Sequence, residues 1–159
     1  MYKQLTADPT GVNDSSAKAE VGAMYQYKHP TYGWWVLRYC QFKDAVTYAA
    51  GQVLTIASAD GSAVTNDVAG GSSLGSIPGG VALTAVTQNY YGYALVDGYY
   101  PTIKTNGDDD ITAANVLLIG AADGVCDSAA ATWTAGSFGV STAADVDADN
   151  TVAGYVRCI

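Results

Sequence analysis

The sequence predicts an all-β protein, a compact antiparallel sandwich or barrel with an extended N-terminal arm. Short runs of alternating apolar and polar residues recur along the chain, and turn dipeptides such as Asp60-Gly61 and Asp123-Gly124 separate them. No stretch has the convincing amphipathic period of a helix. Closely spaced short strands between turns are typical of β-sandwiches and barrels.

Residues 1–30 are expected to form the arm, and residues 31–159 a single β-rich domain. The arm is polar and has no sustained helical or strand period. Proline and glycine interrupt it at Pro9, Gly11, Gly22 and Pro30. Such a segment cannot bury a core of its own, so we expect it to be flexible in isolation.

The domain begins with a long predicted strand from Tyr32 to Phe42, which has large side chains on both faces. A second strand is predicted from Gln52 to Ala57, with Val53 and Thr55 on one face and Leu54 and Ile56 on the other. Glycine and proline punctuate residues 62–80 so often that we expect a surface loop there, with one short strand near Val64.

The stretch from Gly80 to Lys104 organises the rest of the prediction. Residues 81–86 and 90–96 alternate as strands do, and Asp97-Gly98 follows the second run. Asp-Gly between two such runs is a strong signal for a two-residue hairpin turn, because both turn residues need positive φ. Residues 99–104 are therefore expected to return antiparallel. Further strands are predicted at 115–120, 132–134, 138–140 and 151–159.

Charge and hydropathy exclude several classes of partner. The chain carries a net charge of −8, and five of its seven basic residues precede Asp44. Nucleic-acid binding draws on clustered Lys and Arg, so we expect no nucleic-acid partner. No run approaches the about 18 consecutive apolar residues of a membrane span, and the N-terminus lacks the apolar stretch of a signal peptide. Synthesis and retention in a cytoplasm are expected.

Candidate catalytic groups are few. The one histidine, His29, precedes Pro30 in the polar lead-in, where we interpret it as an exposed loop residue. Cys40, Cys126 and Cys158 have no C-x-x-C spacing, and we interpret them as small buried thiols. We therefore predict a protein that is not an enzyme.

Acidic clusters could in principle gather oxygen ligands for a cation. Asp145, Asp147 and Asp149 alternate as at the start of an EF-hand loop, but Asn150 and Val156 stand where that loop needs Gly and Glu. The run Asp108 to Asp110 is interpreted as a solvated acidic turn. No metal site and no cofactor are expected.

Twelve tyrosines and three tryptophans raise a hypothesis of carbohydrate binding, because exposed flat rings can stack on sugars. The predicted hairpin gathers five of them into an aromatic hairpin surface. They are Tyr90, Tyr91, Tyr93, Tyr99 and Tyr100. Aromatic pairing across strands explains the same residues without any ligand, so both interpretations stay open.

Several short motifs resemble those of small tailed-bacteriophage proteins that decorate or cement the capsid. The first group is Tyr32-Gly33, Phe42-Lys43, Ala45-Val46 and Gly51-Gln52-Val53. The second group is Gly80-Val81-Ala82, Tyr91-Gly92-Tyr93 and Val96-Asp97-Gly98. The resemblance covers about residues 32–104, and its motifs are structural, with no catalytic residues to transfer.

The resemblance implies a structural virion protein on the capsid surface, which binds neighbouring subunits of the major capsid protein and stabilises the shell. It also suggests a trimer around a capsid symmetry axis. The arm would order against a neighbouring subunit, since disordered segments can wrap large surfaces on binding. Its expected anchors are Tyr2, Leu5, Met24, Tyr25 and Tyr27. A carbohydrate-binding β-sandwich is the alternative function.

Overall fold

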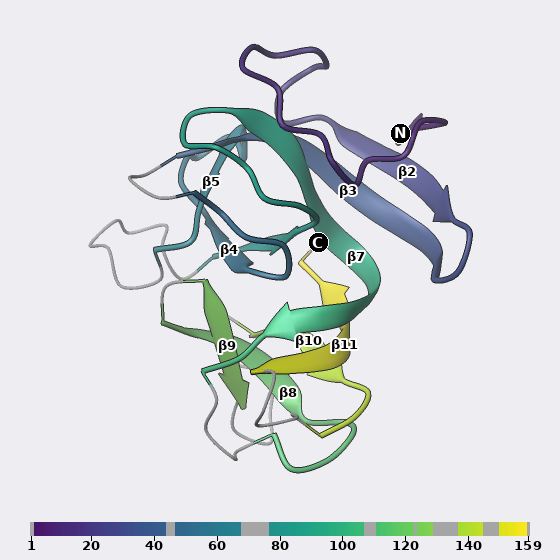
Figure 1. The fold of residues 1–159 in the computed structure, drawn as a ribbon, viewed down its shortest axis with the longest axis vertical. Helices are drawn as coiled ribbons and strands as arrows, with labels where there is room; N and C mark the ends of the chain where they lie inside the picture. The colour runs from purple at the N-terminus through teal and green to yellow at the C-terminus, as the bar shows by residue number, and fades with distance from the viewer. Residues whose placement is uncertain are drawn as a thin grey trace.

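The computed structural model describes residues 2–43, 47–67, 77–106, 111–122, 124–128, 137–144 and 150–158. Every regular element within these ranges is a β-strand, which confirms the all-β prediction (Figure 1). The strands are β1 (Lys3–Gln4), β2 (Met24–His29), β3 (Gly33–Phe42), β4 (Val53–Ile56), β5 (Ala63–Thr65), β6 (Pro78–Ala82), β7 (Tyr91–Lys104), β8 (Leu117–Ala122), β9 (Val125–Ser128), β10 (Ser137–Ser141) and β11 (Thr151–Arg157).

Five of the strands close into a small ring, in the order β3-β5-β4-β6-β7, because β7 also pairs with β3. All pairings in the ring are antiparallel except that of β3 with β5. Apolar side chains from its strands and loops form one core cluster. Its members are Cys40, Phe42, Tyr48, Leu54, Ile56, Val64, Ala82, Val86 and Ala94. This ring is the barrel-like part of the fold.

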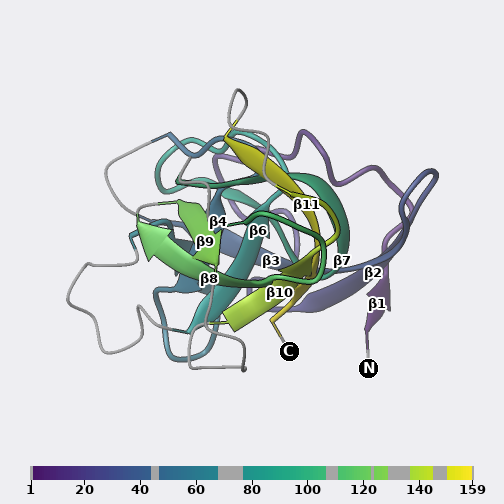
Figure 2. The ribbon, with the colours of Figure 1, turned by 90° about the horizontal axis from the view of Figure 1, so that it is seen from below.

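The long strand β7 joins the ring to the rest of the sheet, which continues as β11-β10-β8-β9 (Figure 2). Residues 91–97 of β7 pair with β3, and residues 97–104 pair with β11. The predicted hairpin at Asp97-Gly98 is therefore wrong, and residues 90–96 and 99–104 largely belong to one strand. The register shifts at this point, and Gly98 has a φ of 132°. The shift lies between Leu95 and Asp97, so Gly98 stands next to a β-bulge, which bends a strand without ending it.

A second, larger core cluster lies outside the ring, on the face of β3 that carries Trp35, Leu37 and Tyr39. It also takes Leu118, Phe138 and other residues from the C-terminal strands. The two clusters share β3 and β7, whose alternate residues face opposite ways. The ring and the C-terminal strands therefore belong to one folded body.

The predicted boundary of the arm at residue 30 is wrong, because residues 24–29 form strand β2. This strand pairs with β3 along its whole length, and Tyr25 is buried in the second core cluster. The short β1 in turn pairs parallel with β2. Tyr25, Tyr27 and His29 share one face of β2 and alternate with Met24, Gln26 and Lys28, a period that the sequence displays.

The loop between β1 and β2 lies against the body, contrary to the expected flexible arm. Asp14 exchanges two backbone hydrogen bonds with Tyr91, each 2.9 Å long. The side-chain amide of Asn13 donates to the Thr87 hydroxyl at 3.1 Å and accepts from the Thr87 backbone N–H at 3.0 Å. Leu5, Val12, Ala19, Val21 and Ala23 pack on the second core cluster. The segment before β2 is thus part of the domain.

Candidate binding surface

Five aromatic rings follow one another across the surface of the sheet, and we call this row the aromatic strip. Its members are Tyr27, His29, Tyr32, Tyr99 and Tyr155. Successive ring centroids lie 6.2, 4.5, 5.4 and 5.5 Å apart. The strip thus runs from β2 through the turn before β3 to β7 and β11.

Trp35 forms the floor of the strip. Its side chain is almost completely buried, and its ring centroid lies 4.4 Å from that of His29 and 6.2 Å from those of Tyr27 and Tyr32. The indole Nε1 donates a hydrogen bond of 2.9 Å to the backbone carbonyl of Tyr99. Contacts with Trp35 therefore hold strip residues from two separate parts of the chain in fixed positions.

His29 has a structural place in the strip. It is the last residue of β2 and is half-buried, so the prediction of an exposed loop residue is wrong. Its Nδ1 accepts hydrogen bonds from the backbone N–H groups of Thr31 and Tyr32, each 3.1 Å long. An accepting Nδ1 places the proton of a neutral imidazole on Nε2. The turn after β2 thus fixes both the ring and its tautomer.

Tyr155 is the exposed end of the strip, with 58% of its surface accessible. It lies directly opposite Tyr99 in the β11–β7 ladder, and the two rings meet edge to face at 66°. Sequence reasoning did not select Tyr155. The period of two along β11 could have identified it. Val152, Gly154 and Val156 face inward, so Tyr155 between them faces outward.

The five tyrosines of the predicted aromatic hairpin surface do not form one surface. Tyr93 and Tyr100 are buried in the second core cluster, and Tyr91 stacks on Tyr39 with centroids 6.1 Å apart. Tyr90 packs against the cluster of the ring, so Tyr99 is the one member that joins the strip. The prediction failed because one continuous strand turns its residues to opposite faces.

The predicted arm anchors are also separated. Tyr25 is a core residue, and Leu5 is half-buried against the same cluster. Met24 is half-buried on the other side of β2, opposite Arg38, while Tyr27 belongs to the strip. Tyr2 is the exposed member, with 41% of its surface accessible.

The thiols agree with the prediction of small buried groups at Cys40 and Cys126, while Cys158 is half-buried. Burial raises the pKa of Cys40 to about 12, so its thiol stays protonated and unreactive at neutral pH. No group of three metal-ligating side chains occurs in the described part of the chain. The acidic runs at 108–110 and 145–149 lie outside that part.

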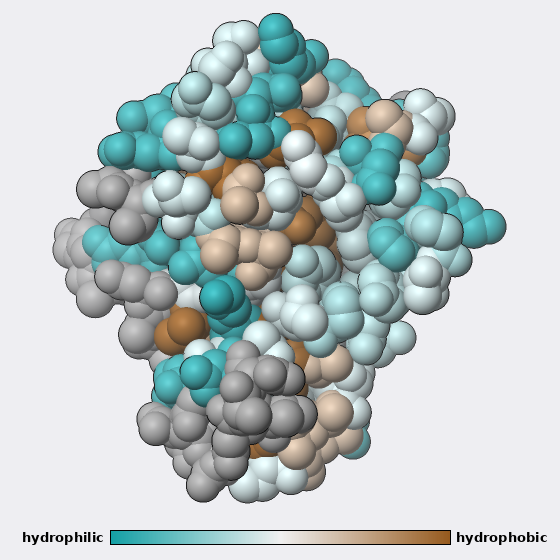
Figure 3. Space-filling view, in the orientation of Figure 1, coloured by the Kyte–Doolittle hydropathy of each residue, from teal (hydrophilic) through white to brown (hydrophobic). Residues whose placement is uncertain are grey.

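Comparison with protein-family models, with curated proteins and with solved structures gives no match for this chain. The described residues contain no helix with the length and hydropathy of a membrane span. On the face shown in Figure 3, apolar residues form separate small patches among polar ones. A binding role for the strip therefore rests on its own chemistry and on the motifs named above.

Proposed function

We propose that this protein is a structural virion protein that decorates and stabilises a phage capsid. The aromatic strip binds the major capsid protein, and the observation that carries this proposal is its fixed row of rings ending in the exposed Tyr155. Tyr and His rings offer apolar area together with a polar tip, and aromatic residues are enriched in protein interfaces. The rings of Tyr27, His29 and Tyr32 already pack on Trp35, so they lose little side-chain entropy on binding.

The motifs of the resemblance support the same proposal through their structural roles. Tyr32, from the first motif, supplies the middle ring of the strip. Gly80, from the second group, packs so closely on β7 that a Cβ would lie 2.4 Å from the carbonyl oxygen of Leu95. These positions shape the strip and the ring, as expected of motifs that specify a structure.

The many identical sites of a capsid allow a small contact surface to bind it tightly. A capsid presents many identical sites, and a copy or trimer that contacts neighbouring subunits converts modest contacts into high avidity. Binding that favours the assembled shell over separated subunits stabilises the shell by mass action. The net charge of −8 keeps unbound copies soluble and apart.

The test compares two exposed aromatic residues of equal accessibility. Trp34 is 57% exposed and makes no ring contact with the strip, so Trp34→Ala is the matched control for Tyr155→Ala. Empty capsids of the encoding phage, assembled without this protein, are mixed with each variant and sedimented. Tyr155→Ala should need roughly tenfold more protein for half occupancy, as for an aromatic interface residue. Equal binding by Tyr155→Ala and the wild type would refute the strip as the contact.

Carbohydrate binding is the second candidate function, and the exposed rings of Trp34 and Tyr155 favour it, because accessible ring faces can stack on sugars. A glycan array with the wild-type protein tests it directly. Glycan binding that both alanine variants abolish, together with no sedimentation on capsids, would replace the decoration proposal by this one.

A further inference from the structure

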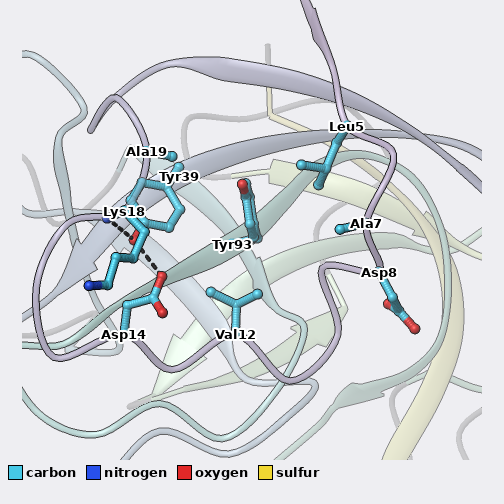
Figure 4. Close-up of a pocket in the computed structure, with 9 residues that line it drawn as sticks. All are labelled: Leu5, Ala7, Asp8, Val12, Asp14, Lys18, Ala19, Tyr39 and Tyr93. Carbon is cyan, nitrogen blue, oxygen red and sulfur yellow. Dashed lines mark hydrogen bonds between the residues drawn. The ribbon is translucent and has the colours of Figure 1, made fainter.

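A cavity of about 200 Å³ opens between the loop that precedes β2 and the strands β3 and β7 (Figure 4). Its walls are mostly apolar and include Leu5, Val12 and Ala19 from the loop. The rings of Tyr39 and Tyr93 line it from the two strands. This volume is below the roughly 300 Å³ at which drug-sized pockets begin, so it suits a single side chain or a small molecule.

Two polar groups in the cavity have unused hydrogen-bonding capacity. The Oδ2 atom of Asp14 accepts from the Tyr39 hydroxyl at 2.8 Å, whereas its Oδ1 has no partner among the described residues. Tyr93 is only 6% exposed, and its hydroxyl has no hydrogen-bond partner in the described part of the chain. Figure 4 shows this hydroxyl directed into the space between Leu5 and Tyr39. Both groups can therefore bond water or a ligand that enters the cavity.

We propose that this cavity binds an organic cation, the ammonium or guanidinium head of an alkyl chain. The head donates hydrogen bonds to Oδ1 of Asp14 and to the hydroxyl oxygen of Tyr93. The alkyl stem lies against Leu5 and Val12. Hydrogen bonds from a charged head to a carboxylate are stronger than neutral ones, and this pairing also neutralises the half-buried Asp14.

The charges around the cavity favour a cation over an anion or a neutral group. In Figure 4 the carboxylate of Asp8 and the ammonium of Lys18 both point away from the cavity, which leaves Asp14 as the charged group at its wall. Burial, followed by the charges of Tyr25 and Asp14, raises the pKa of Tyr93 to about 12, which keeps its hydroxyl neutral and able to accept.

An organic cation of this kind can come from two sources, a Lys or Arg side chain of a protein partner or a free small amine. Titration of the ¹⁵N-labelled protein with N-acetyl-lysine methylamide, N-acetyl-arginine methylamide and n-butylammonium distinguishes them. Amide shifts of residues 12–19 and 93 report occupancy. Tighter binding of the amino-acid amides indicates a protein side chain, and tighter butylammonium binding indicates a free amine. N-acetyl-norleucine methylamide is the neutral isostere and should bind at least tenfold more weakly.

Isosteric variants test the two contacts without disturbing the walls. Asp14→Asn should weaken cation binding at least tenfold, because its side chain still accepts from Tyr39 but carries no charge. Tyr93→Phe should weaken it about threefold. Asp97→Asn removes the same charge from a side chain outside the cavity and should stay within twofold of the wild type. No shift with any cation, equal binding of the neutral isostere or an unaffected Asp14→Asn would each overturn the proposal. These outcomes are independent of capsid sedimentation.

Discussion

Gly98, next to the bulge of β7, lies against Trp35, the floor of the aromatic strip. A Cβ on Gly98 would be 2.8 Å from Cδ1 of Trp35 and 2.9 Å from the carbonyl oxygen of Trp34. Both distances are shorter than van der Waals contact allows, so only glycine fits here without movement of β3. The bulge that bends β7 and the indole that supports the strip are therefore a single packing unit.

Gly98→Ala should lower the free energy of unfolding by about 3 kcal/mol or more, because strain at a φ of 132° adds to the clash with Trp35. Urea denaturation measures this change. Gly33→Ala is the control, since Gly33 also has a positive φ but no atom within 4 Å of the added Cβ. It should cost about 1–2 kcal/mol. An equal loss of unfolding free energy in the two variants would show that the clash with Trp35 does not add to the destabilisation.

Tyr39→Phe should lower the free energy of unfolding by about 1–3 kcal/mol. The Tyr39 hydroxyl donates to Asp14 at 2.8 Å and accepts from the backbone N–H of Lys18 at 3.1 Å, and the variant leaves both groups without this partner. The urea midpoint should fall with an unchanged slope. Tyr155→Phe changes an exposed ring and should stay within about 0.5 kcal/mol of the wild type. An unshifted midpoint for Tyr39→Phe would contradict the structure of the loop.

Deletion of residues 2–20 should lower the melting temperature of the isolated protein. The deletion removes the bridge from Asp14 to Tyr91 and the packing of Leu5, Val12 and Ala19 on the core. A shift of several degrees is expected, since about 1 kcal/mol corresponds to roughly 2–4 °C in a domain of this size. Deleting a flexible tail would leave the melting temperature unchanged. Calorimetry of the full chain and of the deletion variant therefore distinguishes a packed loop from a flexible tail.

Stability should fall as the pH rises from 9 to 12. Burial raises the pKa of Cys40 from 9.0 to about 12, so above pH 9 the unfolded chain loses a proton that the folded protein keeps. One such thiol contributes a slope of up to about 1.4 kcal/mol per pH unit within this window and none below it. Cys40→Ala should make the fall above pH 9 less steep without abolishing it, because the pKa values of Tyr93 and Cys158 are also raised. Its difference from the wild type should be constant between pH 7 and 8.5, and parallel curves throughout would contradict the assignment.

Strong local alternation allowed several strands to be predicted from the sequence. The predicted ranges 32–42, 52–57 and 151–159 correspond to β3, β4 and β11, and the strand near Val64 is β5. Large apolar side chains at a period of two identify such strands whatever their partners. β2 had the same period at Tyr25, Tyr27 and His29, but the surrounding glycine and proline concealed it.

Features that depend on distant partners could not be predicted. Asp97-Gly98 fits a hairpin turn and a bulge equally well by local rules, and only the pairing of β7 with both β3 and β11 selects the bulge. The strip has the same origin, because Tyr32 and Tyr155 meet Tyr99 only through the sheet. Because these residues are far apart in the chain, their proximity cannot be predicted from the sequence, even though each one is an aromatic residue suited to a binding surface.

The dual pairing of β7 also bears on how fast the protein folds. Asp97 pairs with Val36 on one side and with Arg157 on the other, so completing this strand closes two long loops of chain. Loop closure costs entropy before the contacts repay it, and chains dominated by such pairings fold in roughly milliseconds to seconds. We expect stopped-flow refolding of the full chain in that range, with β7 reaching its final pairing late. Microsecond refolding would show that β7 is not the slow element.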